Sequence, residues 1–355
     1  MMQHLANIYR LGIKELRGLW HDKVLFFFII WAFSVGIYTA ATATSTGLNN
    51  APIAFVDEDR SSLSGRIIEA FYKPYFKTPE FIALSDIDPG LDAGIYTFVV
   101  DIPPNFERDV LAGKRPDIQV NIDATRMTQA MIGAGYIQNI INGELMAFVQ
   151  GSRTGAVLPI ELATRVKFNP NLTSAWFGSV MEIINNITML SIILTGAALI
   201  REREHGTLEH LLVMPLGAAE IMLAKVWSMG LVVLVAAGLS LYLIVQGLLS
   251  VPIAGSIPLF MFGALLHLFA TTSMGIFLGT VSRNMPQLGL LMILVILPLQ
   301  MLSGGITPRE SMPEIVQDIM LVAPTTHFVS LAQGILYRGA GFDVVWPQFL
   351  VIIAI

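Results

Sequence analysis

The largest group of side chains that could do chemistry lies in REREHGTLEHLLVMP, residues 201–215, between two strongly apolar regions. Two histidines, His205 and His210, stand close to Glu209, and imidazole and carboxylate groups are common metal ligands. The H-E-x-x-H spacing, which places two histidines one helical turn apart around a base, is missing. A solvated helix face explains all three side chains, so we expect no metal site here.

Glu182 is the only acid near the interior of a strongly apolar stretch. An ionisable residue within a membrane is a candidate for a transport pathway, and the nearby Asn186 is a candidate with it. Glu182 also lies close to one end of its apolar stretch, where pairing with Asn185 or Asn186 would explain it equally well. We expect His267, which has no acid near it in sequence, to be a hydrogen-bonded packing residue.

Two further kinds of site, a cation cluster and a phosphate-binding loop, are considered from the sequence. The acidic run from Asp57 to Asp59 resembles a cation cluster, but acids are also favourable in a turn that precedes a helix, and we expect that role. The phosphate-binding motif G-x-x-x-x-G-K-[ST] is missing, since Lys114 is followed by Arg115. The chain has no cysteine. We therefore expect no catalytic residue and no ATP hydrolysis by this chain.

The composition is that of a membrane protein. Of the 355 residues, 54% are hydrophobic and only 13% are charged. The net charge is -5, and between Val226 and Pro308 the only charged residue is Arg283. A chain with this balance is not expected to bind nucleic acid.

The hydropathy pattern predicts six membrane spans. A spanning helix needs about 20 mostly apolar residues. Five stretches come close to this length or exceed it: residues 24–43, 176–200, 221–249, 257–281 and 288–302, the last extendable from Met285. A sixth begins near Val344 and reaches Ile355 within the apolar run FLVIIAI, so we expect an incomplete last span. Residues 41–43 match a signal-peptidase site, but the long apolar run before them favours an uncleaved first span.

Lysine and arginine near the span ends predict the orientation. They stand before the first span, after the second span and after the fourth span. These are alternate ends, so all can lie on the cytoplasmic side. The sequence therefore predicts a cytoplasmic N-terminus and an extracytoplasmic segment of residues 44–175.

Residues 44–175 have the size and composition of a single water-soluble domain. Strands are predicted at residues 51–57, 81–86, 95–103 and 117–123, and helices at 61–72, 105–114 and 130–149. We expect Ser61 or Ser62 to cap the first helix, Asn105 to cap the second and Gly113 to end it. Alternating strands and helices indicate an α/β layer with one sheet.

Two segments of the remaining chain, residues 176–355, are not ordinary spans. Residues 201–214 are amphipathic, with Leu208, Leu211 and Leu212 on one helix face, as suits a membrane interface or a groove on a partner. Residues 303–337 are too rich in proline and polar residues to cross lipid exposed. We expect a re-entrant hairpin entered from the outer side, with breaks at Pro308, Pro313 and Pro324.

The stretch EREHGTLEHLLVMPL, with Lys225 after it, resembles the cytoplasmic segment of ABC-2 type transporter permeases. In that family R-E-x-E-x-G-T-x-E-x-L precedes a proline and a span with a lysine near its start. The resemblance covers most of the chain, including FNPNLTSAWF at residues 168–177, SGGITPRESMP at 303–313 and APTTHFVSLAQGIL at 323–336. The large domain after the first span is most similar to the bacterial drug-exporter subgroup. Gln333 departs from the basic residue expected in many relatives.

The resemblance implies that residues 201–214 form a coupling helix that docks into a cleft of a separate ABC ATPase subunit. The positions that match the family's docking motif are Glu202, Glu204, Gly206, Thr207 and Glu209. ATP and Mg would be bound by that partner, and this chain would bind no cofactor. The N-terminal helix, within residues 1–23, resembles the family's interfacial helix, and residues 303–337 would form an outer gate.

The expected fold is thus an α-helical polytopic membrane protein of six spans, the last incomplete, with an extracytoplasmic α/β domain between spans one and two. The implied function is the permease subunit of an ATP-driven exporter in the inner membrane, surrounded by lipid and paired with a second protomer of the same or a homologous chain. A periplasmic adaptor and an outer-membrane channel would be further partners in a Gram-negative source. An amphiphilic drug, lipid or peptide substrate fits equally well.

A membrane receptor with an extracytoplasmic ligand-binding domain is the alternative function. It is disfavoured because the predicted cytoplasmic side has only short segments and no output domain. An ATPase encoded by the neighbouring gene would favour transport, whereas a kinase or regulator encoded there would favour sensing.

Overall fold

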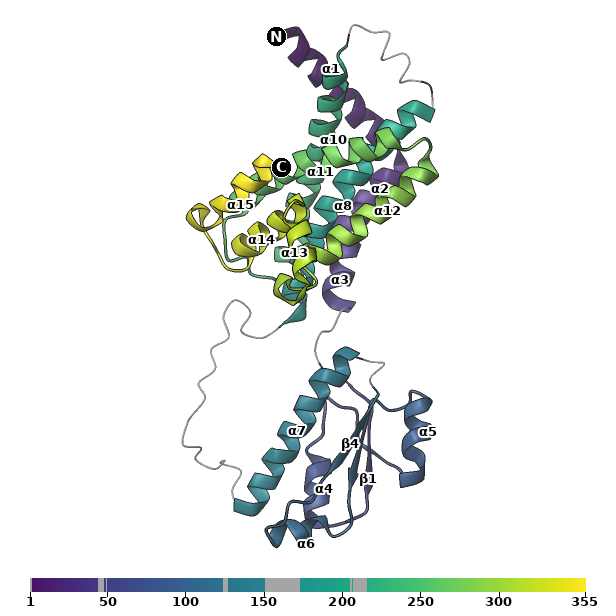
Figure 1. Ribbon diagram of the computed structural model, residues 1–355, viewed down its shortest axis with the longest axis vertical. Coiled ribbons are helices and arrows are strands. Elements are labelled where there is room, and N and C mark those ends of the chain that lie inside the picture. The colour runs from purple at the N-terminus through teal and green to yellow at the C-terminus, as the bar shows by residue number, and fades with distance from the viewer. Residues whose placement is uncertain are drawn as a thin grey trace. The chain divides into compact units, whose positions relative to one another are not determined.

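The computed structural model describes residues 2–43, 48, 50–123, 127–150, 173–204, 206 and 216–355 (Figure 1). The chain forms two compact units. The helical unit consists of Met1–Thr44 and Val166–Ile355, and the α/β unit of Ser45–Arg165.

Five helices in the described part of the helical unit are long and apolar enough to span a membrane: Lys23–Thr42, Ala175–Glu204, Ala218–Leu248, Ile257–Val281 and Met285–Leu302. They confirm the five complete spans predicted from hydropathy. The first consists of α2 (Lys23–Trp31), the π-helical η1 (Ala32–Gly36) and α3 (Ile37–Ala43). The others are α8 (Ser174–Glu204), α10 (Ala218–Ser240) continued by π-helical η4 (Leu241–Leu248), α11 (Ile257–Val281) and α12 (Met285–Leu302).

Helix α8 is the central span of the helical unit. In its most apolar window 83% of the residues are buried, against 22% in α12 and 28% in the first span. It packs against α3, α10, α11 and α12. The outer spans therefore leave broad apolar faces exposed, as is expected of helices that face lipid.

Side-chain caps set where several spans begin. Asp22 accepts a hydrogen bond from the Leu25 amide at the start of α2, and Asn284 accepts one from the Gln287 amide at the start of α12. Ser256 caps α11 in the same way. Each cap satisfies a backbone amide that has no partner inside its helix.

The segment after α12 is bent, as a re-entrant hairpin requires. It contains the 3-10 turn η5 (Arg309–Ser311), α13 (Glu314–Met320), α14 (Pro324–Leu336) and α15 (Phe342–Ala354). Helices α13 and α14 meet at 89°. Pro308 and Pro313 each precede an element, and Pro324 begins α14, so all three prolines stand at element boundaries.

The α/β unit has a four-stranded sheet in the order β2-β1-β3-β4. Its strands are β1 (Ile53–Asp57), β2 (Glu80–Phe81), β3 (Phe98–Ile102) and β4 (Gln119–Ile122), of which only β4 is antiparallel to its neighbour. The helices are α4 (Ser62–Glu69), α5 (Ile87–Asp92), α6 (Phe106–Leu111) and α7 (Met127–Gln150), besides the 3-10 turn η2 (Leu84–Asp86).

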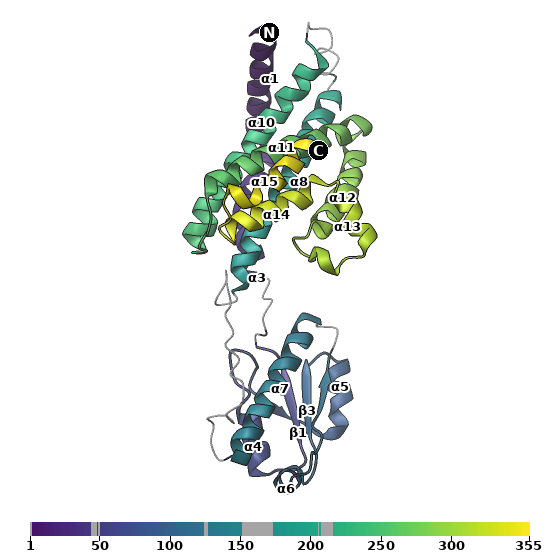
Figure 2. The same ribbon diagram turned by 60° about the vertical axis from the view of Figure 1, so that its left-hand side comes forward.

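Helices cover both faces of this sheet, as Figures 1 and 2 show for α7 and α5. Phe55 and Phe98 pack with side chains of α4 and α7 on one face, whereas Val56 and Val99 pack with Ile87 of α5 on the other. Burial on both faces explains why β1 and β3 are almost continuously apolar.

The structure corrects three details of the predicted domain. Helix α5 was not predicted, and the strand expected at residues 81–86 is mostly replaced by β2 and η2. Asn105 has a left-handed backbone with φ 64° and its side chain does not cap α6. Ser61 does cap α4, in a reciprocal arrangement with Ser64, as expected. Gly113, with φ +72°, follows α6 as predicted.

The missing cap of α6 comes from a loop distant in sequence. Asp59 accepts a hydrogen bond from the Glu107 amide at 3.0 Å, and Glu107 accepts one from the Leu63 amide at 2.9 Å. Asp57 accepts from the amides of Asp59 and Arg60. The acidic run therefore organises a turn and a helix start, as expected for acids at that position.

Candidate functional site

Helix α1 (Met2–His21) packs along the first half of α10, and the two lie side by side in Figures 1 and 2. The Trp227 ring stacks on Tyr9 with ring centroids 6.0 Å apart, and its Nε1 donates to the Ile8 carbonyl at 3.2 Å. A Cβ on Gly12 would lie 2.0 Å from the Trp227 ring. Glycine at this position is what allows α1 to approach α10 so closely.

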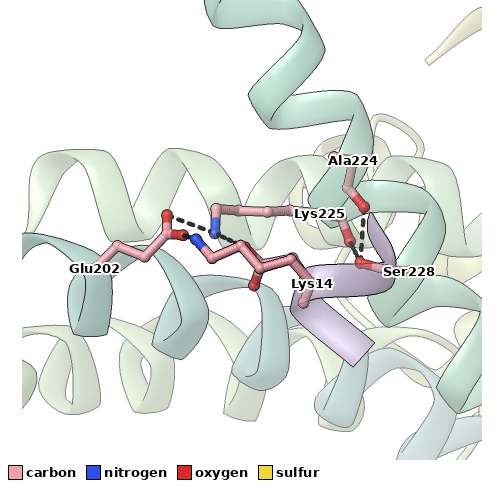
Figure 3. A network of polar contacts seen from close by, with 6 residues as sticks. Lys14, Glu202, Ala224, Lys225 and Ser228 are labelled. Atoms are coloured by element: carbon pink, nitrogen blue, oxygen red, sulfur yellow. Dashed lines mark hydrogen bonds and ion pairs between the residues drawn. The ribbon is translucent and has the colours of Figure 1, made fainter. Parts of the chain in front are cut away.

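Four charged side chains from three helices meet beside this contact, and we call Lys14, Glu15, Glu202 and Lys225 the junction cluster. Figure 3 labels Lys14, Glu202 and Lys225 of this cluster. Lys14 Nζ lies 2.8 Å from one oxygen of Glu202, and Lys225 Nζ lies 2.7 Å from the other. Lys225 Nζ is also 2.9 Å from Glu15 Oε1. The cluster thus ties α1 to the end of α8 and the start of α10.

The junction cluster is buried enough for its pairing to matter. The Lys225 side chain is 1% exposed and that of Glu202 is 10% exposed. Burial raises the pKa of the Glu15 carboxyl, an effect that the neighbouring Lys225 ammonium opposes. Removing one partner from such a group leaves a buried charge uncompensated, at a typical cost of about 3–5 kcal/mol.

The other residues at the end of α8 contact different elements. Arg201 donates to Asp22, the residue that caps α2, at 2.6 Å. Arg203 donates to the carbonyls of Thr280 and Ser282 at the end of α11. Glu204 accepts from the Met285 amide at the start of α12, at 2.9 Å. A cation at a helix C-terminus and an anion at a helix N-terminus are both favourable for the helix dipole.

The five positions of the predicted docking motif are therefore not equivalent. Glu202 and Glu204 bind groups within this chain. Gly206 has φ +68°, and its amide donates to the Arg203 carbonyl directly after α8. Thr207 and Glu209 lie outside the described residues, as does most of the predicted helix at residues 201–214.

The predicted pathway residues lie inside the helical unit. Asn186 is 2% exposed and donates to the Ala32 carbonyl at 2.9 Å, at the start of the π-helical turn η1. Such a turn displaces backbone carbonyls from the regular helical pattern, and Asn186 satisfies one of them. Glu182 lies one turn away and interacts with Asn186, which matches the pairing considered from sequence.

Of the predicted gate prolines, Pro324 lines a cavity of about 840 Å³. The cavity is mostly apolar and is formed by residues of α11, α12, α13, α14 and α15, among them Phe269, Phe277, Leu299 and Ile352. Pro308 and Pro313 do not line it, and neither do Glu182 and Asn186. Of the five predicted pathway and gate residues, only Pro324 lines this cavity.

His267 is the packing residue that its sequence context predicted. It is fully buried, its Nε2 lies 2.9 Å from the Thr188 hydroxyl oxygen, and its ring stacks on Phe328 with centroids 4.1 Å apart. Among the described residues, no three His, Asp or Glu side chains are grouped as a metal site.

Sequence reasoning missed Lys14, Glu15 and Lys225 as functional candidates. The available signal was weak: Lys225 stands near the start of an apolar span, and Lys14 and Glu15 are adjacent charges on an amphipathic helix. A buried lysine needs a carboxylate partner, but its position in sequence does not indicate which one.

Comparisons with known proteins identify the family of this chain and several relatives. Residues 23–355 match the family described as ABC-2 family transporter protein. The chain is 67% identical, over 354 residues, to the "Inner membrane transport permease YhhJ" of Escherichia coli K12, covering all of this chain and 95% of that relative. It is 27% identical to the "Probable multidrug ABC transporter permease YbhR" of the same organism, covering 96% and 92% of the two chains. No solved structure matches the chain.

The family match covers all five span candidates, the α/β unit and the end of α8 with its ion pairs. High identity to an inner-membrane permease over the full chain agrees with the multi-pass helical unit. This chain belongs to the ABC-2 family of transporter proteins and is a multi-pass inner-membrane permease.

Proposed function

We propose that this chain is the permease subunit of an ATP-driven exporter and that a separate ABC ATPase docks on its segment 205–214. Family membership carries the proposal, because ABC transport requires an ATPase and this sequence has no phosphate-binding loop. ATP and Mg would be bound by the ATPase. Thr207 and Glu209 are the proposed contacts, with Gly206 marking the end of α8.

The proposed substrate is an amphiphile moved outward from the inner membrane. Two observations support this class. The cavity of about 840 Å³ has an apolar lining and lies among apolar helices, and the relative YbhR is named as a probable multidrug permease. Apolar cavities with a few polar groups are typical ligand sites.

We further propose that two permease protomers assemble and that the pathway forms between them, with residues 303–337 as an outer gate. The break between α13 and α14 supports a gate, since a bent pair of short helices can move without unfolding a full span. The charge pattern near the span ends supports an α/β unit outside the cytoplasm. We propose that a periplasmic adaptor and an outer-membrane channel are its partners there.

Affinity purification of the detergent-extracted protein from its native host tests the docking proposal. We expect the wild type to retain a protein that carries a phosphate-binding loop and hydrolyses ATP, and we expect Glu209→Arg to lose it. Glu310→Arg is the matched control, because it makes the same charge change on an exposed residue of the proposed outer segment. It should retain the ATPase.

If the wild type retains no ATPase in several mild detergents, the exporter proposal fails. Retention of an ATPase by Glu209→Arg at the wild-type level would instead place the docking surface elsewhere on the chain. Cross-linking of the wild type before extraction distinguishes a weak complex from an absent one.

A further inference from the structure

The end of α8 differs from the rest of the helix in how many elements it contacts. Residues 201–204 are consecutive, and each binds a different part of the chain. Arg201 binds the α2 cap, Glu202 binds α1 and α10, Arg203 binds the end of α11, and Glu204 binds the start of α12. Because successive helical residues point about 100° apart, a single turn can reach neighbours on all sides.

This turn immediately precedes the segment proposed to dock the ATPase. Residues 205–214 stand between α8 and α10 in the chain, so a displacement of this segment can reach the spans through the last turn of α8 as well as through the start of α10. The contacts of residues 201–204 with α1, α2, α10, α11 and α12 would transmit the part of that displacement that reaches α8.

A cavity lies beside the junction cluster. It has a volume of about 360 Å³ and is lined by Lys14, Glu15, Arg201 and Glu202 together with apolar residues such as Leu194 and Met229. Its presence means that α1 and α8 are not closely packed at this level. The ion pair between Lys14 and Glu202 bridges them instead.

Glu202 is the central member of this arrangement. Its two oxygens lie 2.8 Å and 2.7 Å from Lys14 and Lys225, and its side chain is 10% exposed. Because this side chain is nearly buried and both its oxygens contact ammonium groups inside the chain, little of it is accessible to another protein. Glu209, seven residues later in the sequence, has the same residue type and serves as a comparison.

We propose that Glu202 is a positioning residue that holds the docking segment to α1 and α10, and that it does not bind the ATPase. This proposal rests on the proposed function, because it assigns how the docked ATPase moves the spans. Glu202 would transmit the movement through Lys14 to the interfacial helix α1 and through Lys225 to the third span.

The first test compares Glu202→Gln, Glu202→Asp and Glu209→Arg in the complex purified with its ATPase. We expect Glu202→Gln to retain the ATPase within about twofold of wild type, while Glu209→Arg loses it. The kcat for ATP hydrolysis by the Glu202→Gln complex should fall by about fivefold or more, which corresponds to about 1 kcal/mol in the activation free energy. The KM for ATP should not change, since the nucleotide site is on the partner, and Glu202→Asp should recover part of kcat.

A second variant addresses the link to α1 alone. Lys14 is 53% exposed, so Lys14→Gln should fold and retain the ATPase while lowering kcat less than Glu202→Gln does. The chain contains no cysteine, so Lys14→Cys/Glu202→Cys introduces the only two thiols of this chain, and the wild-type complex treated with the same reagent controls for thiols of the ATPase. Joining them with a short bis-methanethiosulfonate reagent should raise kcat above that of the untreated double variant, and a reductant should reverse the gain.

Each other outcome overturns a stated claim. Loss of the ATPase by folded Glu202→Gln, judged by an unchanged gel-filtration profile, would make Glu202 a docking residue and overturn the proposal. Wild-type kcat in Glu202→Gln or in Lys14→Gln, or no gain on cross-linking, would also overturn it. A wild-type protein that binds no ATPase would instead overturn the proposed function, before any variant is compared.

Discussion

Buried polar side chains in this protein mostly have partners from elements that are distant in sequence. Lys225 lies between Glu15 and Glu202, and His267 lies between Thr188 and Phe328. Some buried polar atoms have no hydrogen-bond partner within the described part of the chain, among them His267 Nδ1 and, in β3, Asp101 Oδ1. A carboxylate oxygen that is buried without a partner destabilises the folded state when the group is charged.

The Asp101 carboxyl allows us to predict the direction in which folding stability changes with pH. Burial and the neighbouring Glu58 raise its pKa above the ordinary value of 3.8. The folded state therefore favours the protonated form, and the resulting stability is complete below pH 3.8 and is lost as the pH rises through the folded pKa. We expect Asp101→Asn to slow hydrogen exchange of the β1 and β3 amides at pH 7, with a smaller difference toward pH 4 after correction for intrinsic rates.

Asp109 provides a control, because its pKa is shifted in the direction opposite to that of Asp101. Hydrogen bonds from Lys114 and Arg108 lower the pKa of this carboxyl, so its contribution to stability is present at neutral pH and is lost in acid. Asp109→Asn should not slow exchange at pH 7. Equal slowing in both variants would show that the effect comes from reduced negative charge and not from burial of Asp101.

At the scale of elements, the helical unit depends on close contact between α8 and α11. A Cβ on Gly275 would lie 2.6 Å from the Ile192 carbonyl oxygen, and one on Gly279 would lie 3.2 Å from that of Gly196. Glycines four residues apart allow two membrane helices to approach closely. Polar bonds add to this contact, since Ser191 donates to the Thr271 hydroxyl at 2.7 Å.

The alanine variant of Gly275 tests this contact. The added methyl group meets the α8 backbone, which cannot move aside as a side chain can, so we expect Gly275→Ala to destabilise the protein by about 1–3 kcal/mol. Gly289→Ala in α12 is the matched control, because a Cβ there meets nothing within 4 Å. The measurement is the apparent melting temperature in detergent. Equal melting temperatures for the two variants would contradict the predicted clash.

For the whole molecule, the charge pattern predicts which side of the membrane each unit faces. The helical unit begins with α1 and its basic residues, and the α/β unit is inserted after the first span. Lysine and arginine remain on the cytoplasmic side of most membrane proteins. The N-terminus should therefore be cytoplasmic and the α/β unit should face the periplasm.

Cysteine labelling in cells checks this orientation, because the native chain has no cysteine. A membrane-impermeant maleimide should label Ser85→Cys, at an exposed position of the α/β unit, in cells whose inner membrane is intact. Arg10→Cys, exposed on α1, should be labelled only after that membrane is permeabilised. The reverse pattern would invert the topology and with it the proposed cytoplasmic docking segment.

Much of the architecture follows from local patterns. Five spans, the α/β unit and the break at Pro324 were predicted because apolar length, strand alternation and proline restrict the nearby backbone directly. The α5 helix was missed because IDPGLD is short and contains Pro89 and Gly90, which locally favour a turn. The cap of α6 was misassigned to Asn105 because the true acceptor, Asp59, comes from another loop.

By itself the sequence determined that this is a polytopic membrane protein with an inserted α/β unit and no phosphate-binding loop, since these properties depend on composition and on neighbouring residues. Only the tertiary structure decided what the charges at residues 201–204 bind. Lys14 is 188 residues from Glu202 in sequence, and their side chains meet only because α1 packs on α10 beside the end of α8. Hydropathy and helical period are local, whereas ion pairing depends on contacts that folding alone creates.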